Sequence, residues 1–495
     1  MKMSHSCKRK RQFIISKLCL KYRNLPLQVK ASIWFLICSF FQKGISTLTT
    51  PIFTRIMSPS EYGHYNVFNS WMGIISIFVT MNLSYGVYTQ GLIKFDKEKQ
   101  LFSSSLQGLS AFMVSIWTGV YLCTRQFWND CFSMTTVQMI AMLIMIWTTA
   151  VFNFWASEQR SHYQYRTLVA ITVGISLAKP LLGIVLVSHA QDKVTMRILG
   201  LMLVELLGYA PLFFIQINRG KRIYSKKFWK YALSFNLPLI PHYLSQTVLN
   251  SADRIMIKNM VGADAAGIYS LAYSISLIMT LFNSALTSTI NPWIYQKIKQ
   301  KKIKDLSKIA YSTLIGVAGL NLVLIALAPE AVKFFAPSSY YEAIYVIPPV
   351  AMSVYFMYAY DLFAKFAFYY EKTKFIMIAS VMGAVINVIL NDIFITRYGY
   401  IAAGYTTLVC YIIYNICHYI FMNKVCDQFC DGVRPYEIRK ILCITIVFLT
   451  IGFLLLLTYN IAVLRYGIIA VGCLIVISNK NLLYCEIKKL TQKSN

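Results

Sequence analysis

Residues 31–57 read ASIWFLICSFFQKGISTLTTPIFTRIM. Most of these positions are apolar, and a run of about 20 apolar residues is long enough to cross the hydrocarbon core of a bilayer as a helix. The residues before the run are basic, and no cleavage site of small residues follows it. The stretch therefore predicts a first membrane helix behind a basic cytoplasmic tail at residues 1–30, and not a cleaved signal peptide.

Comparable apolar runs recur along the whole 495-residue chain, which is 57% hydrophobic and 14% charged. An ordinary soluble domain has about 25% charged residues, so this composition predicts an all-α integral membrane protein with short loops and no soluble domain. Fourteen transmembrane spans are expected, at residues 31–53, 65–90, 101–122, 136–156, 166–188, 198–217, 231–252, 265–292, 309–328, 343–364, 374–391, 401–421, 440–459 and 464–484.

The formal net charge of +29 follows the loops between these spans. If the N-terminus is cytoplasmic, 37 of the 48 Lys and Arg residues lie in cytoplasmic segments and only nine in outer loops. This asymmetry is the positive-inside pattern, which places both termini in the cytoplasm and requires an even number of spans. Anionic lipid headgroups account for the basic charge, so nucleic acid is not expected as a partner.

The chain contains an internal repeat. An Arg-Ile-Met tripeptide stands at residues 55–57 and again at 254–256, and a Gly-x-Tyr follows each at 63–65 and 267–269. Six spans separate the two copies, so both copies have the same orientation, as in transporters built from parallel repeats. The predicted organisation is a tail, a six-helix bundle, a basic cytoplasmic linker, a second six-helix bundle and two extra helices, at residues 1–30, 31–217, 218–230, 231–421 and 440–484.

Short motifs lie near the ends of the predicted spans. They are MSPSEYGHY (57–65), LPLIPH (237–242), DR (253–254), AGIYS (266–270), EKTK (371–374), NVILN (387–391) and YGYIAAG (398–404). As an ordered set, they resemble the Wzx-type polysaccharide flippases of the MOP superfamily, which have the MATE fold.

The resemblance implies a protein of the bacterial inner membrane. Its substrate would be an oligosaccharide linked to undecaprenyl pyrophosphate, moved from the cytoplasmic to the outer leaflet by alternating access to feed O-antigen, capsule or a similar surface glycan. No cofactor is expected apart from a coupling ion, H⁺ or Na⁺. It is open whether the protein works alone or beside a polysaccharide polymerase.

Polar residues in the first span follow a helical spacing. Lys43, Thr47, Thr50 and Thr54 are spaced i, i+4, i+7 and i+11 and so share one helix face. We expect this face to line the cavity, with Lys43 and Arg55 meeting the phosphates. The alternative is a seam between helices, because threonine also packs and hydrogen-bonds between membrane helices.

The seventh span has a similar set at Gln246, Asn250 and Arg254. Pro238 and Pro241 are expected to break or kink this helix, and broken helices often lie beside transporter sites. Arg254 is expected either to contact the substrate or to pair with the neighbouring Asp253 at an outer gate.

Further charges lie within the spans. Lys179 and Glu205 are each about ten residues from the turn between the fifth and sixth spans, so a rise of 1.5 Å per residue places them at similar depth. They are expected to form a buried ion pair, or else Lys179 meets phosphate and Glu205 carries a coupling proton. Asp361 and Lys365 are spaced as an i, i+4 ion pair.

Other functions remain open at this point. They are a cation-coupled small-molecule antiporter of the MATE kind, a flippase for the peptidoglycan precursor, and a polytopic sugar polymerase or ligase. An enzyme is not expected, because the outer loops are short and hold no catalytic carboxylate pair or nucleophile–base set. No metal site is expected at Cys426 and Cys430, whereas Cys123 and Cys131 are close enough in sequence for a disulfide.

Overall fold

The computed structural model describes residues 25–478, and every regular element in that range is helical. Most of the predicted tail, up to residue 24, and the end of the last predicted span, from residue 479, lie outside the described residues. The helices are α2 (Leu27–Ile56), α3 (Pro59–Thr80), α4 (Val87–Lys94), α5 (Lys99–Cys123), α6 (Arg125–Phe132), α7 (Thr136–Ser161), α8 (Tyr165–Ser188), α9 (Lys193–Gly220), α10 (Lys226–Asn236), α11 (Ile240–Met260), α12 (Ala263–Ser276), α13 (Met279–Lys299), α14 (Leu306–Ala326), α15 (Ala328–Phe335), α16 (Ile347–Tyr369), α17 (Thr373–Tyr398), α18 (Ala402–Phe429), α19 (Ile438–Leu457) and α20 (Ala462–Ser478). Short 3₁₀ turns lie at Asp96–Glu98, Leu237–Leu239, Ile303–Asp305 and Ser338–Tyr345.

Each of the fourteen predicted spans overlaps at least one of these helices. Within the described residues, ten helical segments are long and apolar enough to cross a membrane. The number is eleven if the bent pair Ser338–Tyr345 and Ile347–Tyr369 is one span. Of the other three predicted spans, α3 and α11 carry polar residues, and the apolar part of α20 is short at Ala462–Val471. The prediction of an all-helical membrane protein is therefore confirmed.

Local sequence explains several helix ends. Thr135 caps α7 in a reciprocal arrangement. Its side chain accepts a hydrogen bond from the backbone N–H of Gln138, and the Gln138 side chain accepts one from the backbone N–H of Thr135. Gly399 ends α17 with φ of 73°, a left-handed conformation that glycine adopts without steric cost. The expected break at Pro238 is confirmed, because a 3₁₀ turn at Leu237–Leu239 separates α10 from α11.

Contacts between Cα atoms divide the chain into two compact units. The first unit comprises Met1–Leu48, Val79–Leu186 and Ile198–Leu237, and the second comprises Thr49–Phe78, Val187–Arg197 and Pro238–Asn495. The second unit thus includes the C-terminal end of α2, most of α3 and the turn between α8 and α9.

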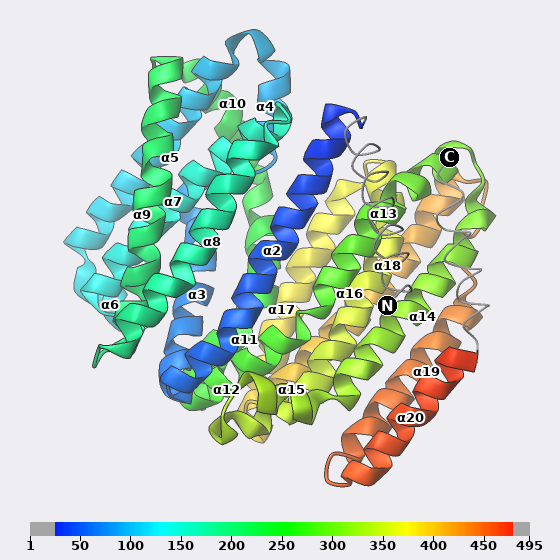
Figure 1. Cartoon of the computed structure of the whole chain (residues 1–495). Coiled ribbons are helices and arrows are strands. Elements are labelled where there is room, and N and C mark those ends of the chain that lie inside the picture. The colour runs from blue at the N-terminus through cyan, green and yellow to red at the C-terminus, as the bar shows by residue number, and fades with distance from the viewer. Residues whose placement is uncertain (1–24, 479–495) are drawn as a thin grey trace, which may run out of the picture. The chain divides into compact units, whose positions relative to one another are not determined.

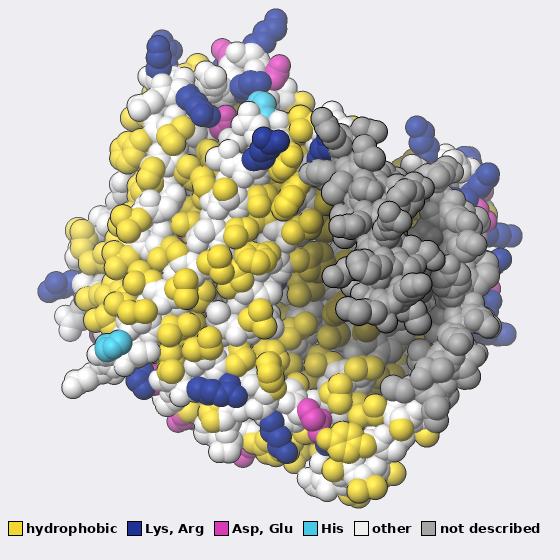
Figure 2. Space-filling view, viewed as in Figure 1, with side chains coloured by type: hydrophobic (Ala, Val, Ile, Leu, Met, Phe, Trp, Pro, Cys, Tyr) yellow, Lys and Arg dark blue, Asp and Glu magenta, His cyan; other side chains and the backbone are white. Residues whose placement is uncertain are grey.

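The first unit has an aromatic core between α4, α5, α7 and α10. Tyr88 stacks on Phe102 with ring centroids 5.8 Å apart and meets Phe154 edge-on at 4.8 Å. Phe228 of α10 packs edge-on against Phe102 at 5.3 Å. On the face shown in Figure 2, hydrophobic side chains cover the middle of this unit's helices, while Lys and Arg lie mainly toward their ends. That distribution suits a membrane-embedded surface.

In the second unit, α16 is the central helix (Figure 1). Most of its side chains are buried, and its most extensive contacts are with α18 and α14. Tyr355 and Phe363 of α16 pack against Phe448 of α19 and Tyr419 of α18, with ring centroids 4.5 and 5.3 Å apart. Helices α12, α13, α14, α17, α18 and α19 therefore pack against α16.

Candidate functional site

The polar face of α2 is divided between two environments. Lys43 is exposed, and Thr47 donates a hydrogen bond to the Lys43 carbonyl at 2.9 Å. Thr54 is only 1% exposed, and its hydroxyl donates to the Phe335 carbonyl at 2.6 Å. Thr50 is half-buried. At Thr54 the face is therefore a seam between packed segments, while Lys43 is left available for a ligand.

Arg55 lies at the end of α2 and is held by backbone carbonyls. Its guanidinium donates to Pro51 at 2.7 Å and to Phe334 at 3.0 Å, and the side chain remains exposed. Lys43 and Arg55 form no ion pair with any described residue. Both cations are thus uncompensated by carboxylates, as a phosphate contact would require.

The two Gly-x-Tyr motifs of the repeat pack against each other. A Cβ atom on Gly63 would lie 2.0 Å from the Ala263 carbonyl oxygen, and one on Gly267 would lie 2.0 Å from the Pro59 carbonyl oxygen. The contact is reciprocal, since each glycine faces the residue four positions before the other. Only glycine allows the first turns of α3 and α12 to approach this closely.

Arg197 was not among the predicted site residues. It is 8% exposed, with its guanidinium carbon 3.7 Å from the Phe53 ring centroid and 3.6 Å from that of Tyr65. Its Nη1 also donates to Met57 Sδ at 3.4 Å. These contacts tie the first turns of α9 to the α2–α3 connection. In the sequence, Arg197 is simply one more cation of a short loop, so no local signal identifies it.

The predicted polar residues of α11 are brought together with α12 and α17. Gln246 donates to the Ser380 hydroxyl at 2.9 Å, and Asn250 accepts from the Tyr273 hydroxyl at 3.4 Å. The Arg254 guanidinium lies over the Tyr273 ring at 4.5 Å. Arg254 forms no salt bridge with a described residue, although its charge acts on the adjacent Asp253, so the two alternatives for Arg254, substrate contact or pairing with Asp253, both stay predictions.

Asp253 instead has three uncharged donors. It is 2% exposed and accepts from the Tyr269 hydroxyl at 2.6 Å, the Asn391 amide at 2.6 Å and the Thr407 hydroxyl at 2.9 Å. Thr406 donates in turn to Asn391. A buried carboxylate satisfied only by neutral donors keeps its net charge. The donors lie on α12, α17 and α18, too far along the chain for the sequence to have linked them to Asp253.

Lys179 and Glu205 form the expected ion pair, with Nζ and Oε1 2.6 Å apart. The hydroxyls of Thr148 and Thr149 each donate to Glu205 Oε2 at 3.2 Å. Glu205 is buried, and Lys179 is half-buried. The pair is therefore neutral overall, which leaves Lys179 less available to a phosphate than an uncompensated lysine.

A second buried carboxylate of the first unit was missed. Glu158 near the end of α7 accepts from the Gln216 amide at 2.5 Å, and Gln216 accepts from the Gln107 amide at 2.6 Å. All three side chains are buried. The predicted span ends at residue 156, which placed Glu158 in the loop that follows, whereas α7 continues to Ser161.

Asp361 and Lys365 of α16 form the predicted i, i+4 ion pair at 2.7 Å. The two cysteine predictions are separate from this site. Cys123 and Cys131 carry free, exposed thiols. Cys426 and Cys430 are buried, and the described residues contain no group of three or more His, Cys, Asp or Glu side chains arranged to hold a metal.

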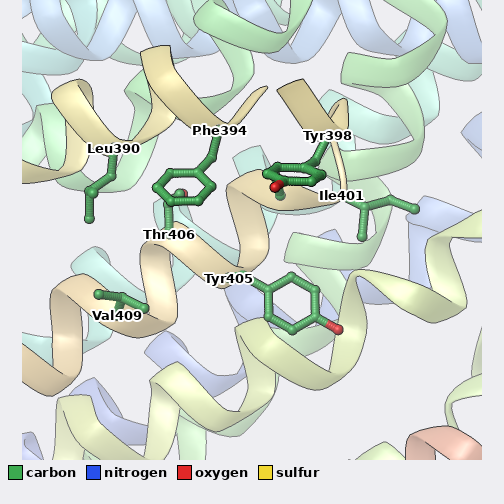
Figure 3. A pocket seen from close by; sticks show the side chains of 8 residues that line it. Leu390, Phe394, Tyr398, Ile401, Tyr405, Thr406 and Val409 are labelled. Atoms are coloured by element: carbon green, nitrogen blue, oxygen red, sulfur yellow. The ribbon is translucent and has the colours of Figure 1, made fainter. Parts of the chain in front are cut away.

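An apolar groove of about 540 Å³ lies between α17 and α18 (Figure 3). The rings of Phe394 and Tyr398 line one side, and Tyr405 and Val409 line the other. The Thr406 hydroxyl is already bonded to Asn391 and to the Ala403 carbonyl. The groove therefore offers hydrocarbon contacts and is not a phosphate site.

Comparison with protein families gives two matches. A family model described as "Polysaccharide biosynthesis protein" matches residues 29–298. A second model, described as MatE, matches residues 238–393.

Two curated relatives come from Haemophilus influenzae. A protein of the Lsg locus is 26% identical over 207 residues, which are 40% of this chain and 52% of the relative. The chain thus spans about half the length of that relative. An uncharacterized membrane protein is 23% identical over 386 residues, which are 72% of this chain and 88% of the relative.

Two solved structures share the architecture. The lipid II flippase MurJ in an inward closed conformation has a TM-score of 0.63 and 16% identity, and the match covers 91% of this chain and 100% of that chain. An inward-facing multidrug resistance MATE family transporter of the MOP superfamily has a TM-score of 0.58 and 13% identity, with 78% and 95% covered. At these identities the likeness shows the fold alone.

Proposed function

The chain belongs to the polysaccharide biosynthesis protein family, and we propose that it is a Wzx-type flippase for lipid-linked oligosaccharides. It would move oligosaccharide units on undecaprenyl pyrophosphate from the cytoplasmic to the outer leaflet of a bacterial inner membrane. The fold likeness to the lipid II flippase MurJ supports a lipid-linked substrate. Export of such units would serve the synthesis of O-antigen or another surface polysaccharide.

One observation carries this proposal. The first helix of each repeat presents a cation that forms no salt bridge with a described residue, Lys43 on α2 and Arg254 on α11, although Arg254 interacts electrostatically with the adjacent Asp253. Lys43 lies within a predicted span, where a charge costs roughly 2.5–3.5 kcal/mol on insertion scales, so it is retained where it has a partner or a function. A pyrophosphate would supply the missing negative charge, and arginine is suited to bind it with two parallel hydrogen bonds. Thr47, Thr50, Gln246 and Asn250 would add polar contacts beside these cations.

The glycine crossing supports alternating access. With the N-terminus in the cytoplasm, the contact between Gly63 and Gly267 would lie at the outer end of the second unit. Arg55 and Arg197 reinforce the same end through Phe334 and Tyr65. We assign this contact as a closed outer gate that opens to release the substrate.

A coupling ion, H⁺ or Na⁺, would act at a buried carboxylate. Asp253 is the better candidate, because its three donors are neutral, whereas Glu205 is already compensated by Lys179. Binding of a cation at Asp253 would lower the cost of burying its charge. No chemical step is assigned to the protein, and a polysaccharide polymerase would be the consumer of the exported units.

Complementation tests the proposal. The gene is deleted, and surface polysaccharide is scored after return of wild type, Lys43→Ala, Arg254→Ala or Asp253→Asn. Arg125→Ala, which removes an exposed cation of α6, is the matched control. Deletion should abolish the glycan and cause lipid-linked units to accumulate on the cytoplasmic side. The site variants should fail at wild-type expression, while Arg125→Ala should succeed.

A different result would support the antiporter suggested by the MatE match. In that case the glycan would be unchanged by deletion, and the cells would become sensitive to cationic drugs.

A further inference from the structure

We propose that α13 and α16 form a binding site for the neutral sugar portion of the substrate, built around the Asp361–Lys365 ion pair. The proposal rests on the function proposed above and names a subsite for one part of its ligand. We define the hydroxyl face as Ser284, Thr287, Ser288 and Asn291 of α13. All of these residues and both members of the ion pair belong to the second unit.

The hydroxyl face lies on one side of a helix in a segment long and apolar enough to cross a membrane. Ser284, Ser288 and Asn291 are spaced i, i+4 and i+7, so they share a face. The hydroxyls of Ser284 and Ser288 donate to the carbonyls four residues earlier, Thr280 and Ser284, at 2.7 and 2.6 Å. Both side chains are exposed, and their oxygens keep lone pairs that can accept hydrogen bonds from a ligand.

The ion pair is joined to this face through two side chains of α13. Thr287 donates to Asp361 Oδ2 at 3.3 Å, while Lys365 donates to Asp361 Oδ1 at 2.7 Å. With its side-chain amide flipped, Asn291 would accept a hydrogen bond from Lys365 Nζ at 3.2 Å. The four side chains thus connect α13 and α16 in one polar cluster.

Exposure shows which partner of the ion pair is open to a ligand. The Lys365 side chain is 7% exposed, whereas that of Asp361 is 27% exposed. Asp361 lies near the cytoplasmic end of the predicted span 343–364, where a partly exposed carboxylate is more stable facing water than lipid chains. Asp361 therefore offers acceptor positions beside the exposed serine hydroxyls.

The charge balance selects the ligand class. The pair is neutral as a whole, so it provides no net attraction for a phosphate, in contrast to Lys43 and Arg254. It offers acceptors and donors at close spacing, which suits a ligand with several adjacent hydroxyl groups. Carbohydrate hydroxyls both donate and accept hydrogen bonds, and they fit this mixed set better than an anion or an apolar drug.

Binding measurements on the full-length protein in nanodiscs test the proposal. Two probes are compared: the lipid-linked oligosaccharide extracted from the deletion strain, and undecaprenyl pyrophosphate without sugar. The double variant Ser284→Ala, Ser288→Ala removes two exposed hydroxyls and should fold, because alanine is the better helix former. Ser312→Ala on α14 is the matched control, since its hydroxyl has the same bond to the carbonyl four residues earlier, at 3.0 Å.

The double variant should weaken binding of the oligosaccharide lipid by on the order of tenfold, as expected for the loss of about two hydrogen bonds. The affinity of the double variant for undecaprenyl pyrophosphate should stay within twofold of wild type. The affinities of Ser312→Ala for both lipids should also stay within twofold of wild type. Replacement of Ser288 by Thr, which keeps the hydroxyl, should retain binding.

Two outcomes would overturn the subsite alone: equal weakening for both lipids, or no weakening for either. If the wild-type protein binds neither lipid, the proposed function fails, and the sugar subsite fails with it.

Discussion

Replacement of Gly63 by alanine should force apart the first turns of α3 and α12. The new Cβ would lie 2.0 Å from the Ala263 carbonyl oxygen and 2.8 Å from the Gly267 nitrogen, whereas ordinary contacts begin at 3.4 Å. The oxygen contact is therefore too short by about 1.4 Å, the difference between 3.4 and 2.0 Å. Both facing atoms belong to the backbone, so rotation of a side chain cannot relieve the clash.

Overpacking of this kind costs about 1–3 kcal/mol. Because the clash exists only while the two turns are in contact, the cost falls on the closed arrangement alone. At 1.4 kcal/mol per factor of ten, the ratio of closed to open molecules should fall by roughly 5- to 150-fold. Gly267→Ala should have a similar effect, since its Cβ would meet the Pro59 carbonyl oxygen at 2.0 Å.

Hydrogen exchange measured by mass spectrometry in nanodiscs would detect the change. Amides in the first turns of α3 and α12 should exchange faster in either single variant than in wild type. The double variant should cost little more than one substitution, because separated helices accommodate both methyl groups. Gly316→Ala on α14 is the control, as its Cβ would meet nothing within 4 Å.

Wild-type exchange in Gly63→Ala would refute the reasoning, because the turns would then tolerate the methyl group without separating. Fully additive effects of the two substitutions would also contradict it, since they would mean that the glycines act at independent contacts.

Three further predictions concern charges and thiols. Lys179→Met should destabilise the protein by about 3–5 kcal/mol by leaving the buried Glu205 without its cation. The double variant Lys179→Met, Glu205→Gln should recover most of that stability, as measured by thermal unfolding of the purified proteins. A double variant as unstable as Lys179→Met would contradict the ion-pair account. Lys43→Met should leave Tm unchanged or slightly higher, because it removes an uncompensated charge from a span. The amount of surface glycan should nevertheless fall. A decrease in Tm that parallels the loss of glycan would mean that Lys43 has a structural role. Cys123 and Cys131 should both react with a membrane-impermeant maleimide on intact cells, because their thiols are free and exposed and α6 is predicted to lie outside the cytoplasm. Labelling that occurs only after lysis would show that the predicted topology is inverted.

Much of the fold followed from the sequence, because membrane spans are long and uniform in composition. Fourteen apolar runs predicted the helical segments. The sequence also predicted the repeat, but not that its two glycines meet. Matching motifs at residues 63–65 and 267–269 predict that two halves are related, whereas only the three-dimensional structure shows that Gly63 lies against Ala263.

The site was harder to predict, because contacts between distant segments have no local signal. Lys179 and Glu205 could be paired because one turn connects their helices and sets their depth. Thr54 shares the spacing of Lys43 and Thr47, yet it is buried against Phe335, about 280 residues away in the chain. Helical periodicity identifies a polar face, but it does not tell which neighbour covers each turn of that face.

The distribution of charge compensation connects the two proposals. Lys179–Glu205 and Asp361–Lys365 are neutral pairs, whereas Lys43 and Arg254 form no salt bridge with a described residue. A lipid-linked oligosaccharide has an anionic pyrophosphate and a glycan rich in hydroxyl groups, so its two parts require different surroundings. Cations without a salt bridge attract the pyrophosphate but gain little from contact with the glycan. A neutral ion pair flanked by hydroxyl groups can bind the glycan but does not attract the pyrophosphate. Separate variants at Lys43 and at Ser288 should therefore impair recognition of different parts of one substrate.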